Sequence, residues 1–259
     1  MTSQDGYLVR LAESEADHAA ALRLRYRVFV EELGANGPLV DHQAKMERDE
    51  FDLHFDHLVL IDRRRNARDL DHVVGVYRLL PCDRMSTAGR FYSETEFDLS
   101  VLKSSGRRLL ELGRSCVDPL HRGGTGMFLM WNALAGYVLE REIDILFGAA
   151  SLRGTDVEAL NLPLSYLYHN HLAPELLRVR AIGPQAAAMD RIPKAQIDRR
   201  EASANIPALI KAYLRLGGFV GDGAYVDHAF NTTDVCLVMD TERMSAKHRD
   251  FYTKRRAEA

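Results

Sequence analysis

The sequence predicts a protein of the α/β (α+β) class, with a mixed, mostly antiparallel central sheet and flanking helices. Short apolar runs alternate with helical patterns along the chain. Two early runs, 57–62 and 73–80, are joined by a charged turn, as antiparallel neighbours are. Later, a strand, a glycine-rich turn, a helix and a second strand follow one another over 109–150. That order is typical of a βαβ-like unit with two parallel strands.

In the first third of the chain, periodicity and helix breakers place the elements. Ser14 and Asp17 resemble a capping start, and apolar residues then recur at helical spacing until Gly34. The acidic stretch that follows has no period. Pro81 ends the second early strand, because proline cannot donate to a sheet. We therefore expect a helix at 14–33, a loop at 41–56, and strands at 57–62 and 73–80.

The rest of the chain has a regular central unit and a less regular C-terminal half. Residues 84–105 are mixed and predict a loop with a short helix. Pro207 fits the first turn of a helix. We expect strands at 109–117, 143–150 and 234–239, and helices at 127–141, 156–171 and 205–216. With 259 residues and no repeat or linker, we expect one domain, 1–259, with an elaborated half at about 151–240.

Composition and charge narrow the classes of function. The formal net charge is −3, which predicts no general attraction to nucleic acid. Cysteine occurs three times and never as CxxC, so a reduced, cytoplasmic compartment is expected. The N-terminus lacks the apolar core of a signal peptide, and no run approaches the roughly 20 apolar residues of a membrane span. Membrane contact, where it occurs, is expected to be peripheral, at the inner face.

The glycine-rich turn formed by Arg122, Gly123, Gly124, Thr125 and Gly126 is a candidate phosphate site. Backbone N–H groups at a helix N-terminus are unpaired and lie at the positive end of the helix dipole, and glycines let an anion approach them. The alternative is an ordinary turn with a helix cap. The turn is neither a P-loop nor a GxGxxG fingerprint.

Glu111 and Arg114 stand just upstream, as charges in an apolar strand pattern. Residues three apart in a regular strand point to opposite faces, but a bulge at Gly113 would aim both into one cleft. They would then suit acid–base chemistry. A solvated ion pair on the strand face is the alternative reading.

Three further groups of residues are candidates for substrate binding or for a structural role. Arg25 and Phe29 lie four apart, on one face of the first expected helix. Asp49 and Asp52 are acids that either hold a cationic substrate or face solvent. Arg78 lies near the end of an otherwise apolar strand, where an arginine needs an anionic partner, and a substrate carboxylate would supply one.

Metal and serine chemistry are not indicated. The close histidine pairs, at 54 and 57 and at 169 and 171, have no cysteine nearby, and HExxH and GxSxG are absent. We therefore expect no metal.

The order of these motifs resembles that of a known group of enzymes. Its members are the acyl-homoserine-lactone synthases, which have the Gcn5-related N-acyltransferase (GNAT) fold. The motifs are Arg25-x-x-x-Phe29, Asp49-x-x-Asp52, Gly75-x-x-Arg78-Leu79 and Glu111-x-x-Arg114. The tryptophan that those synthases carry after the first helix is missing from 33–38, which speaks against lactone synthesis.

The C-terminal half contains a second set of motifs: Ser151–Thr155, Leu162–Ser165, Pro207–Gly217, Gly221–Gly223, Asp227-His228 and Asn231–Asp234. These segments resemble the ornithine-lipid branch of the same superfamily, the L-ornithine Nα-acyltransferases. The likeness spans roughly residues 20 to 240. His121 is the one departure from the usual glycine-loop pattern.

The resemblance implies the GNAT fold and a reaction. A 3-hydroxyacyl group passes from acyl carrier protein to the α-amine of L-ornithine, giving lyso-ornithine lipid for a partner O-acyltransferase. No cofactor is bound permanently, because the carrier protein delivers the 4'-phosphopantetheine thioester. Glu111 is then the candidate base, acting directly or through one water, and a backbone N–H at 115–117 is the oxyanion donor.

The resemblance also suggests how substrate and carrier protein bind. The loop at 122–126 would hold the phosphate. Arg78 or Arg114 would hold the ornithine carboxylate, and Asp49 or Asp52 its side-chain ammonium. Alternatively, these acids and arginines pair with one another as a scaffold. Three basic patches are equal candidates for docking the acidic carrier protein: 63–68, 103–108 and 254–256.

Rival functions remain open at the level of the sequence. Another acceptor, such as glutamine or glycine, would keep the chemistry and give a different aminolipid. A lactone synthase would use S-adenosylmethionine instead. A non-enzymatic alternative is an acyl-carrier-binding or membrane-binding protein that keeps the fold.

Overall fold

The computed structural model describes residues 2–243, which form two compact units. The first unit comprises the residues up to Ala88 together with Leu112–Glu142. The second comprises Gly89–Glu111 and the residues from Ile143 onward. The boundary at residue 111 falls inside strand β6 (Leu109–Val117). The expectation of one domain stays a prediction.

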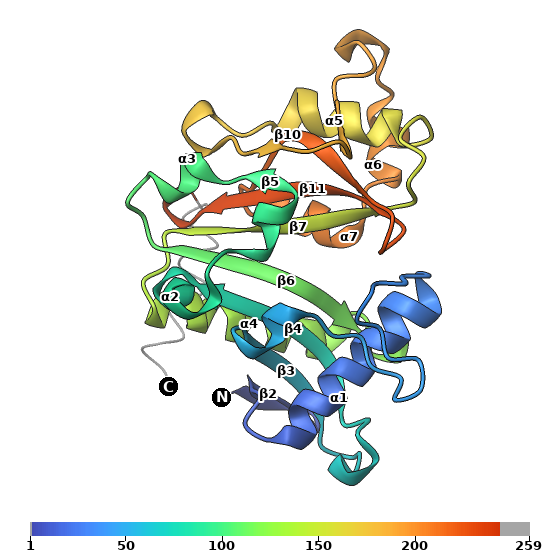
Figure 1. Ribbon diagram of the computed structural model, residues 1–259, viewed down its shortest axis with the longest axis vertical. Coiled ribbons are helices and arrows are strands. Elements are labelled where there is room, and N and C mark those ends of the chain that lie inside the picture. The colour runs from blue at the N-terminus through green and yellow to red at the C-terminus, as the bar shows by residue number, and fades with distance from the viewer. Residues whose placement is uncertain (1, 244–259) are drawn as a thin grey trace. The chain divides into compact units, whose positions relative to one another are not determined.

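The first unit contains an antiparallel run of strands. It consists of β1 (Thr2–Gln4), β2 (Tyr7–Leu11), β3 (Asp56–Asp62) and β4 (Val73–Pro81), each antiparallel to the next (Figure 1). The strands predicted at 57–62 and 73–80 are confirmed. The β1–β2 hairpin was missed, although its turn dipeptide, Asp5-Gly6, is typical of a hairpin with both residues at positive φ.

Two helices cover β3 on opposite faces, which explains why this strand is buried almost throughout. Helix α1 (Glu15–Arg25) packs with Val59 and Ile61 in one apolar cluster. Leu60 points the other way, toward α4 (Gly124–Glu140), where a Cβ atom at Gly126 would lie 2.9 Å from Leu60 Cδ2. The predicted helix at 127–141 is therefore confirmed and begins three residues earlier.

The first helix changes type part-way along. After Arg25 the chain continues as a π-helix, Tyr26–Glu32, in which the Leu33 N–H donates to the Val28 carbonyl at 3.2 Å. The expectation of one regular helix over 14–33 is therefore wrong beyond residue 25. In a π-helix, whose hydrogen bonds run from residue i to i+5, residues four apart still lie near one face, so the shared face of Arg25 and Phe29 stays a prediction.

The second unit is built on a second set of paired strands. The first three residues of β6 run parallel to β7 (Ile145–Arg153), which confirms the predicted parallel pair. Strand β11 (Thr232–Asp240) is antiparallel to β7 and to β10 (Phe219–Asp227). Short strands extend this set: β5 (Phe97–Asp98), β8 (Arg180–Ala181) and β9 (Ala186–Ala187). Strand β10 was missed because its glycines interrupt the apolar pattern.

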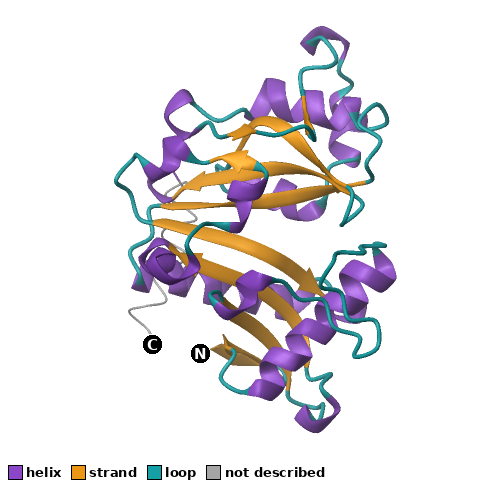
Figure 2. Ribbon diagram, in the orientation of Figure 1, coloured by secondary structure: helices purple, strands orange, loops and turns teal. Residues whose placement is uncertain are grey.

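The helices of the second unit lie against these strands (Figure 2). Helix α5 (Asn161–His171) contacts β10 and α6 (Arg199–Ala204), and α7 (Ala208–Arg215) contacts β11. The helices predicted at 156–171 and 205–216 are thus confirmed but shorter. Pro163 lies in the first turn of α5, where its missing N–H costs no helical bond.

Short helical turns occur outside the longer elements, including one in the loop expected at 41–56 and others in the segment 84–105, where a short helix was expected. Two are α-helical, α2 (Met85–Ala88) and α3 (Ser100–Lys103), and the others are 3₁₀ helices: Glu50–Leu53, Ala67–Asp69, Cys82–Arg84, Tyr92–Thr95, Pro119–His121, Glu175–Leu177, Lys194–Gln196 and Thr241–Arg243. Within residues 2–243, no helix is long and apolar enough to cross a membrane.

Candidate functional site

The glycine-rich turn joins the end of β6 to the start of α4. The Asp118 N–H donates to the Val74 carbonyl at 2.9 Å and fixes the end of β6 to β4. Gly123 and Gly124 have φ values of +89° and +60°, which side chains with a Cβ rarely adopt. A Cβ atom at either position would meet nothing within 4 Å. The turn is therefore open on the side of these glycines, at the N-terminus of α4, as an anion site requires.

The side chains of the same turn have structural roles. Arg122 forms a two-pronged ion pair with Glu32, 2.7 Å from Nη1 to Oε1. That hydrogen bond also raises the Arg122 pKa. Thr125 Oγ1 lies 3.3 Å from Asp5. Five residues were predicted to bind a phosphate. The backbone of the glycines suits an anion better than the side chains of Arg122 and Thr125, which already contact acidic residues.

A buried network of opposite charges dominates the first unit, and we call it the arginine–carboxylate cluster. Its members are Arg25, Arg78, Arg114, Glu47, Asp49 and Asp52. Sequence analysis singled out all of them except Glu47, which no pattern in the sequence marks. Because three arginines face three carboxylates, the cluster is formally neutral.

Each arginine of the cluster bridges two carboxylates. Arg25 Nε donates to Glu47 at 2.5 Å, and Arg25 Nη1 bonds Asp52. Arg78 Nη1 donates to Asp49 at 2.5 Å and to Asp52 at 2.8 Å.

The third arginine of the cluster enters from β6. Arg114 Nη2 donates to Asp49 at 2.9 Å, and its Nε lies 3.4 Å from Glu47. Arg114 has φ of +48°, so the irregularity expected at Gly113 occurs one residue later, at Arg114 itself.

Local structure explains why the two aspartates face inward. Asp49 caps the 3₁₀ helix Glu50–Leu53 by accepting from the Phe51 N–H at 2.9 Å. Asp52 closes the capping box by accepting from the Asp49 N–H at 2.8 Å. The spacing Asp49-x-x-Asp52 is therefore a helix cap as well as a charge motif.

Electrostatics keep the acids of the cluster ionised. Burial alone would raise the pKa of Asp52, but Arg25 and Arg78 lower it below its ordinary value. Burial would likewise raise the pKa of Glu47, and Arg114 and Arg25 lower it. Of the two interpretations of these residues, a substrate-binding loop or an ion-paired scaffold, the contacts within the described chain match the scaffold.

Phe29 and Arg78 also contact apolar and aromatic side chains. Phe29 is half-buried against the apolar cluster of α1 and β3. The Arg78 guanidinium lies 4.4 Å from the centre of the Phe55 ring.

Glu111 lies in the second unit and is 1% exposed. Its two carboxylate oxygens accept hydrogen bonds from the Tyr92 N–H at 2.8 Å and the Ser93 N–H at 2.6 Å. It therefore anchors the 3₁₀ turn Tyr92–Thr95. The expectation that Glu111 and Arg114 point into one cleft stays a prediction.

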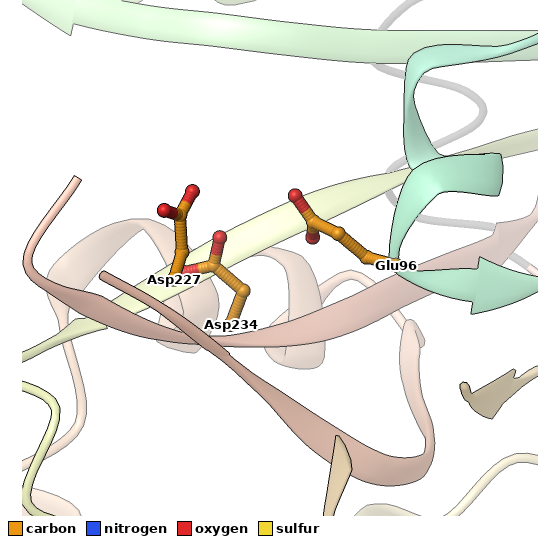
Figure 3. Close-up of side chains that lie close together, drawn as sticks. All are labelled: Glu96, Asp227 and Asp234. Atoms are coloured by element: carbon orange, nitrogen blue, oxygen red, sulfur yellow. The ribbon is translucent and has the colours of Figure 1, made fainter. Parts of the chain in front are cut away.

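A second group of acids, which we call the acidic trio, lies in the second unit. It comprises Glu96, Asp227 and Asp234, which offer oxygens within 4.8 Å of one another (Figure 3). Glu96 and Asp234 are buried and Asp227 is half-buried. Such a set can hold a cation. The sequence motifs contained Asp227 and Asp234 but gave them no role, and Glu96 was not singled out.

Comparison with known proteins places the chain among N-acyltransferases. A family model described as an acetyltransferase (GNAT) domain matches residues 24–132. An L-ornithine N(alpha)-acyltransferase of Rhodobacter capsulatus is 61% identical over 249 residues, which cover 96% of this chain and 95% of that protein. One of Brucella abortus is 41% identical over 246 residues, 94% of this chain and 88% of that protein.

Solved structures agree on the fold. A CoA-dependent acyl-homoserine lactone synthase is 15% identical, with a TM-score of 0.53 and coverage of 96% of this chain and 89% of that one. The GNAT fold predicted from the sequence is thereby confirmed, and so is the resemblance to the ornithine branch.

Proposed function

The chain belongs to the L-ornithine N(alpha)-acyltransferase family, and from that membership we propose that it acylates the α-amine of L-ornithine. The donor in this proposal is a 3-hydroxyacyl-acyl carrier protein, and the product is lyso-ornithine lipid. The observation that carries the proposal is the 61% identity over nearly the full length of both proteins, because it includes the second unit as well as the GNAT core.

In the proposed reaction, the α-amine nitrogen attacks the thioester carbonyl carbon. The C–S bond breaks, the amide C–N bond forms, and the pantetheine leaves as a thiol after taking up a proton. The amine must first lose a proton, because an ammonium group has no lone pair. The backbone of Gly123 and Gly124 is proposed to hold the pantetheine phosphate at the N-terminus of α4.

Glu111 is the proposed general base, acting on the amine directly or through one water. Its hydrogen bonds to the N–H groups of Tyr92 and Ser93 support this role, because they favour the carboxylate form that a base needs. The oxyanion donor is proposed to be a backbone N–H of residues 115–117, just beyond the irregular backbone at Arg114.

The arginine–carboxylate cluster is proposed to shape the first unit, while Arg78 and Arg114 remain candidates for the ornithine carboxylate.

Two basic patches are proposed to dock the carrier protein. In the first, Arg64 pairs with Asp62 at 2.7 Å. In the second, Arg107 pairs with Asp240 at 2.6 Å. The third candidate, 254–256, lies outside the described residues. Because the proposed product is an amphiphile, we also propose that the protein contacts the membrane surface and that a partner O-acyltransferase uses the product.

The decisive experiment incubates the purified protein with 3-hydroxyacyl-carrier protein and a panel of amino acids, and identifies products by mass spectrometry. An N-acyl-ornithine product is expected. A product with glutamine or glycine instead would contradict the assignment of the acceptor. No product with any acceptor, from folded protein, would favour the non-enzymatic alternative.

A matched pair of variants tests Glu111. Glu111→Gln is expected to lower kcat about 100-fold or more, as the loss of a general base does. Glu94→Gln is the control, because Glu94 also accepts a backbone N–H in the same turn, from Phe91 at 2.9 Å. Equal losses in both variants, with matching losses of thermal stability, would show that Glu111 only anchors the turn.

A further inference from the structure

We propose that the acidic trio binds the side-chain ammonium of the amino-acid acceptor and so selects a diamino acid. This inference rests on the proposed function, because it names the part of the second unit that would recognise the cationic end of ornithine. Asp49 and Asp52, which the sequence suggested for this role, are hydrogen-bonded to Arg25, Arg78 and Arg114.

The register of the β10–β11 hairpin brings two members of the trio together. Asp227 lies opposite Thr232, and Tyr225 lies opposite Asp234. Because side chains alternate along a strand, all four leave the same face of the hairpin. Glu96 approaches that face from the segment just before β5, and Figure 3 shows its carboxylate turned toward Asp234.

A second observation points to a ligand at this face. Thr232 is only 6% exposed, and its Oγ1 has no hydrogen-bond partner within residues 2–243. Buried hydroxyl groups are nearly always satisfied, because leaving one without a partner is costly. As Thr232 faces the same side as Asp227 and Asp234, a bound group that donates or accepts a hydrogen bond there would satisfy it.

The geometry suits a primary ammonium group. Such a group has three N–H donors and no acceptor, and the trio offers three carboxylates within 4.8 Å of one another. Tyr225 lies beside them: burial raises its pKa, and the charges of Glu96, Asp227 and Asp234 raise it further. Its phenol therefore stays protonated and adds no charge to the site.

The test compares L-ornithine with L-norvaline, which has the same carbon chain but no terminal amine. Asp234→Asn is expected to raise the KM for ornithine about 10- to 100-fold, the loss expected for a hydrogen bond to a charged group. Its KM for norvaline should not change. Asp227→Asn, at the half-buried member, provides a second variant if Asp234→Asn does not fold. Asp222→Asn is the control, because Asp222 also lies on β10 but pairs with Arg180 at 3.7 Å.

Direct binding of the two amino acids, measured by calorimetry, gives a readout independent of turnover. If the wild-type protein does not acylate ornithine, the proposed function fails. If it does, but Asp234→Asn and Asp227→Asn treat ornithine as the wild type does, or lose ornithine and norvaline equally, the inference fails. The inference is also overturned if the protein contains a divalent metal that these variants lose and chelation abolishes activity.

Discussion

Replacing Asp52 by asparagine should destabilise the protein through two buried arginines at once. Asp52 accepts hydrogen bonds from both Arg25 and Arg78, whose side chains are 0% exposed. Asparagine keeps the size of the side chain but removes the charge, so the arginine–carboxylate cluster changes from neutral to a net charge of +1. Because the Arg25 and Arg78 side chains are 0% exposed, that charge is solvated much less than it would be in bulk water.

The size of the effect follows from the burial. Removing one partner of a buried ion pair costs about 3–5 kcal/mol. The Asp52 side chain is 14% exposed, which places the expected loss at the lower end, about 3 kcal/mol. For a protein of this size, that corresponds to a fall in Tm of about 6–12 °C.

Urea unfolding and thermal melts of wild type, Asp52→Asn and Glu31→Gln measure this loss. Glu31 pairs with Lys45 at 3.3 Å, and both side chains are exposed, so its replacement should cost less than about 1 kcal/mol. The double variant Asp52→Asn/Arg25→Gln should be more stable than the sum of the single losses predicts, because it restores neutrality. A loss below about 1 kcal/mol in Asp52→Asn, or strict additivity, would refute the reasoning.

Three further predictions concern other parts of the chain. Gly123→Ala should raise the KM for the acyl donor and cost about 1 kcal/mol of stability, because the φ of Gly123 is +89°. Gly136→Ala is the control: no atom lies within 4 Å of a Cβ at this position in α4, so the KM should not change. Steady-state kinetics and thermal melts of the two variants measure these effects. Burial lowers the His57 pKa to about 3, so His57 contributes stability that is present above its unfolded value of about 6.5 and is lost progressively as pH falls toward 3. His57→Gln should therefore flatten the fall of unfolding free energy between pH 6.5 and 4, and an unchanged slope would contradict this. Gly221→Ala should cost more than about 2 kcal/mol in urea unfolding, because its Cβ would lie 2.9 Å from the Val179 carbonyl oxygen, and near-wild-type stability would contradict that clash.

The sequence by itself determined the elements whose signals are local. Apolar runs located β3, β4, β6 and β7, and the order of strand, glycine turn and helix predicted the parallel pair and the open turn at 123–124. These features depend on neighbouring residues, so a pattern along the chain is enough to find them. The missed elements were short, as in the β1–β2 hairpin, or interrupted by glycine, as in β10.

Only the tertiary structure decided what each charge contacts. Arg25, Asp52, Arg78 and Arg114 were all candidates from the sequence, yet the structure pairs them with one another and with Glu47, which no motif marked. The acidic trio likewise joins Glu96 to a hairpin far along the chain. The physical reason is that periodicity reports burial, whereas the choice between solvent, substrate and another charge depends on which distant residues the fold brings within hydrogen-bonding distance.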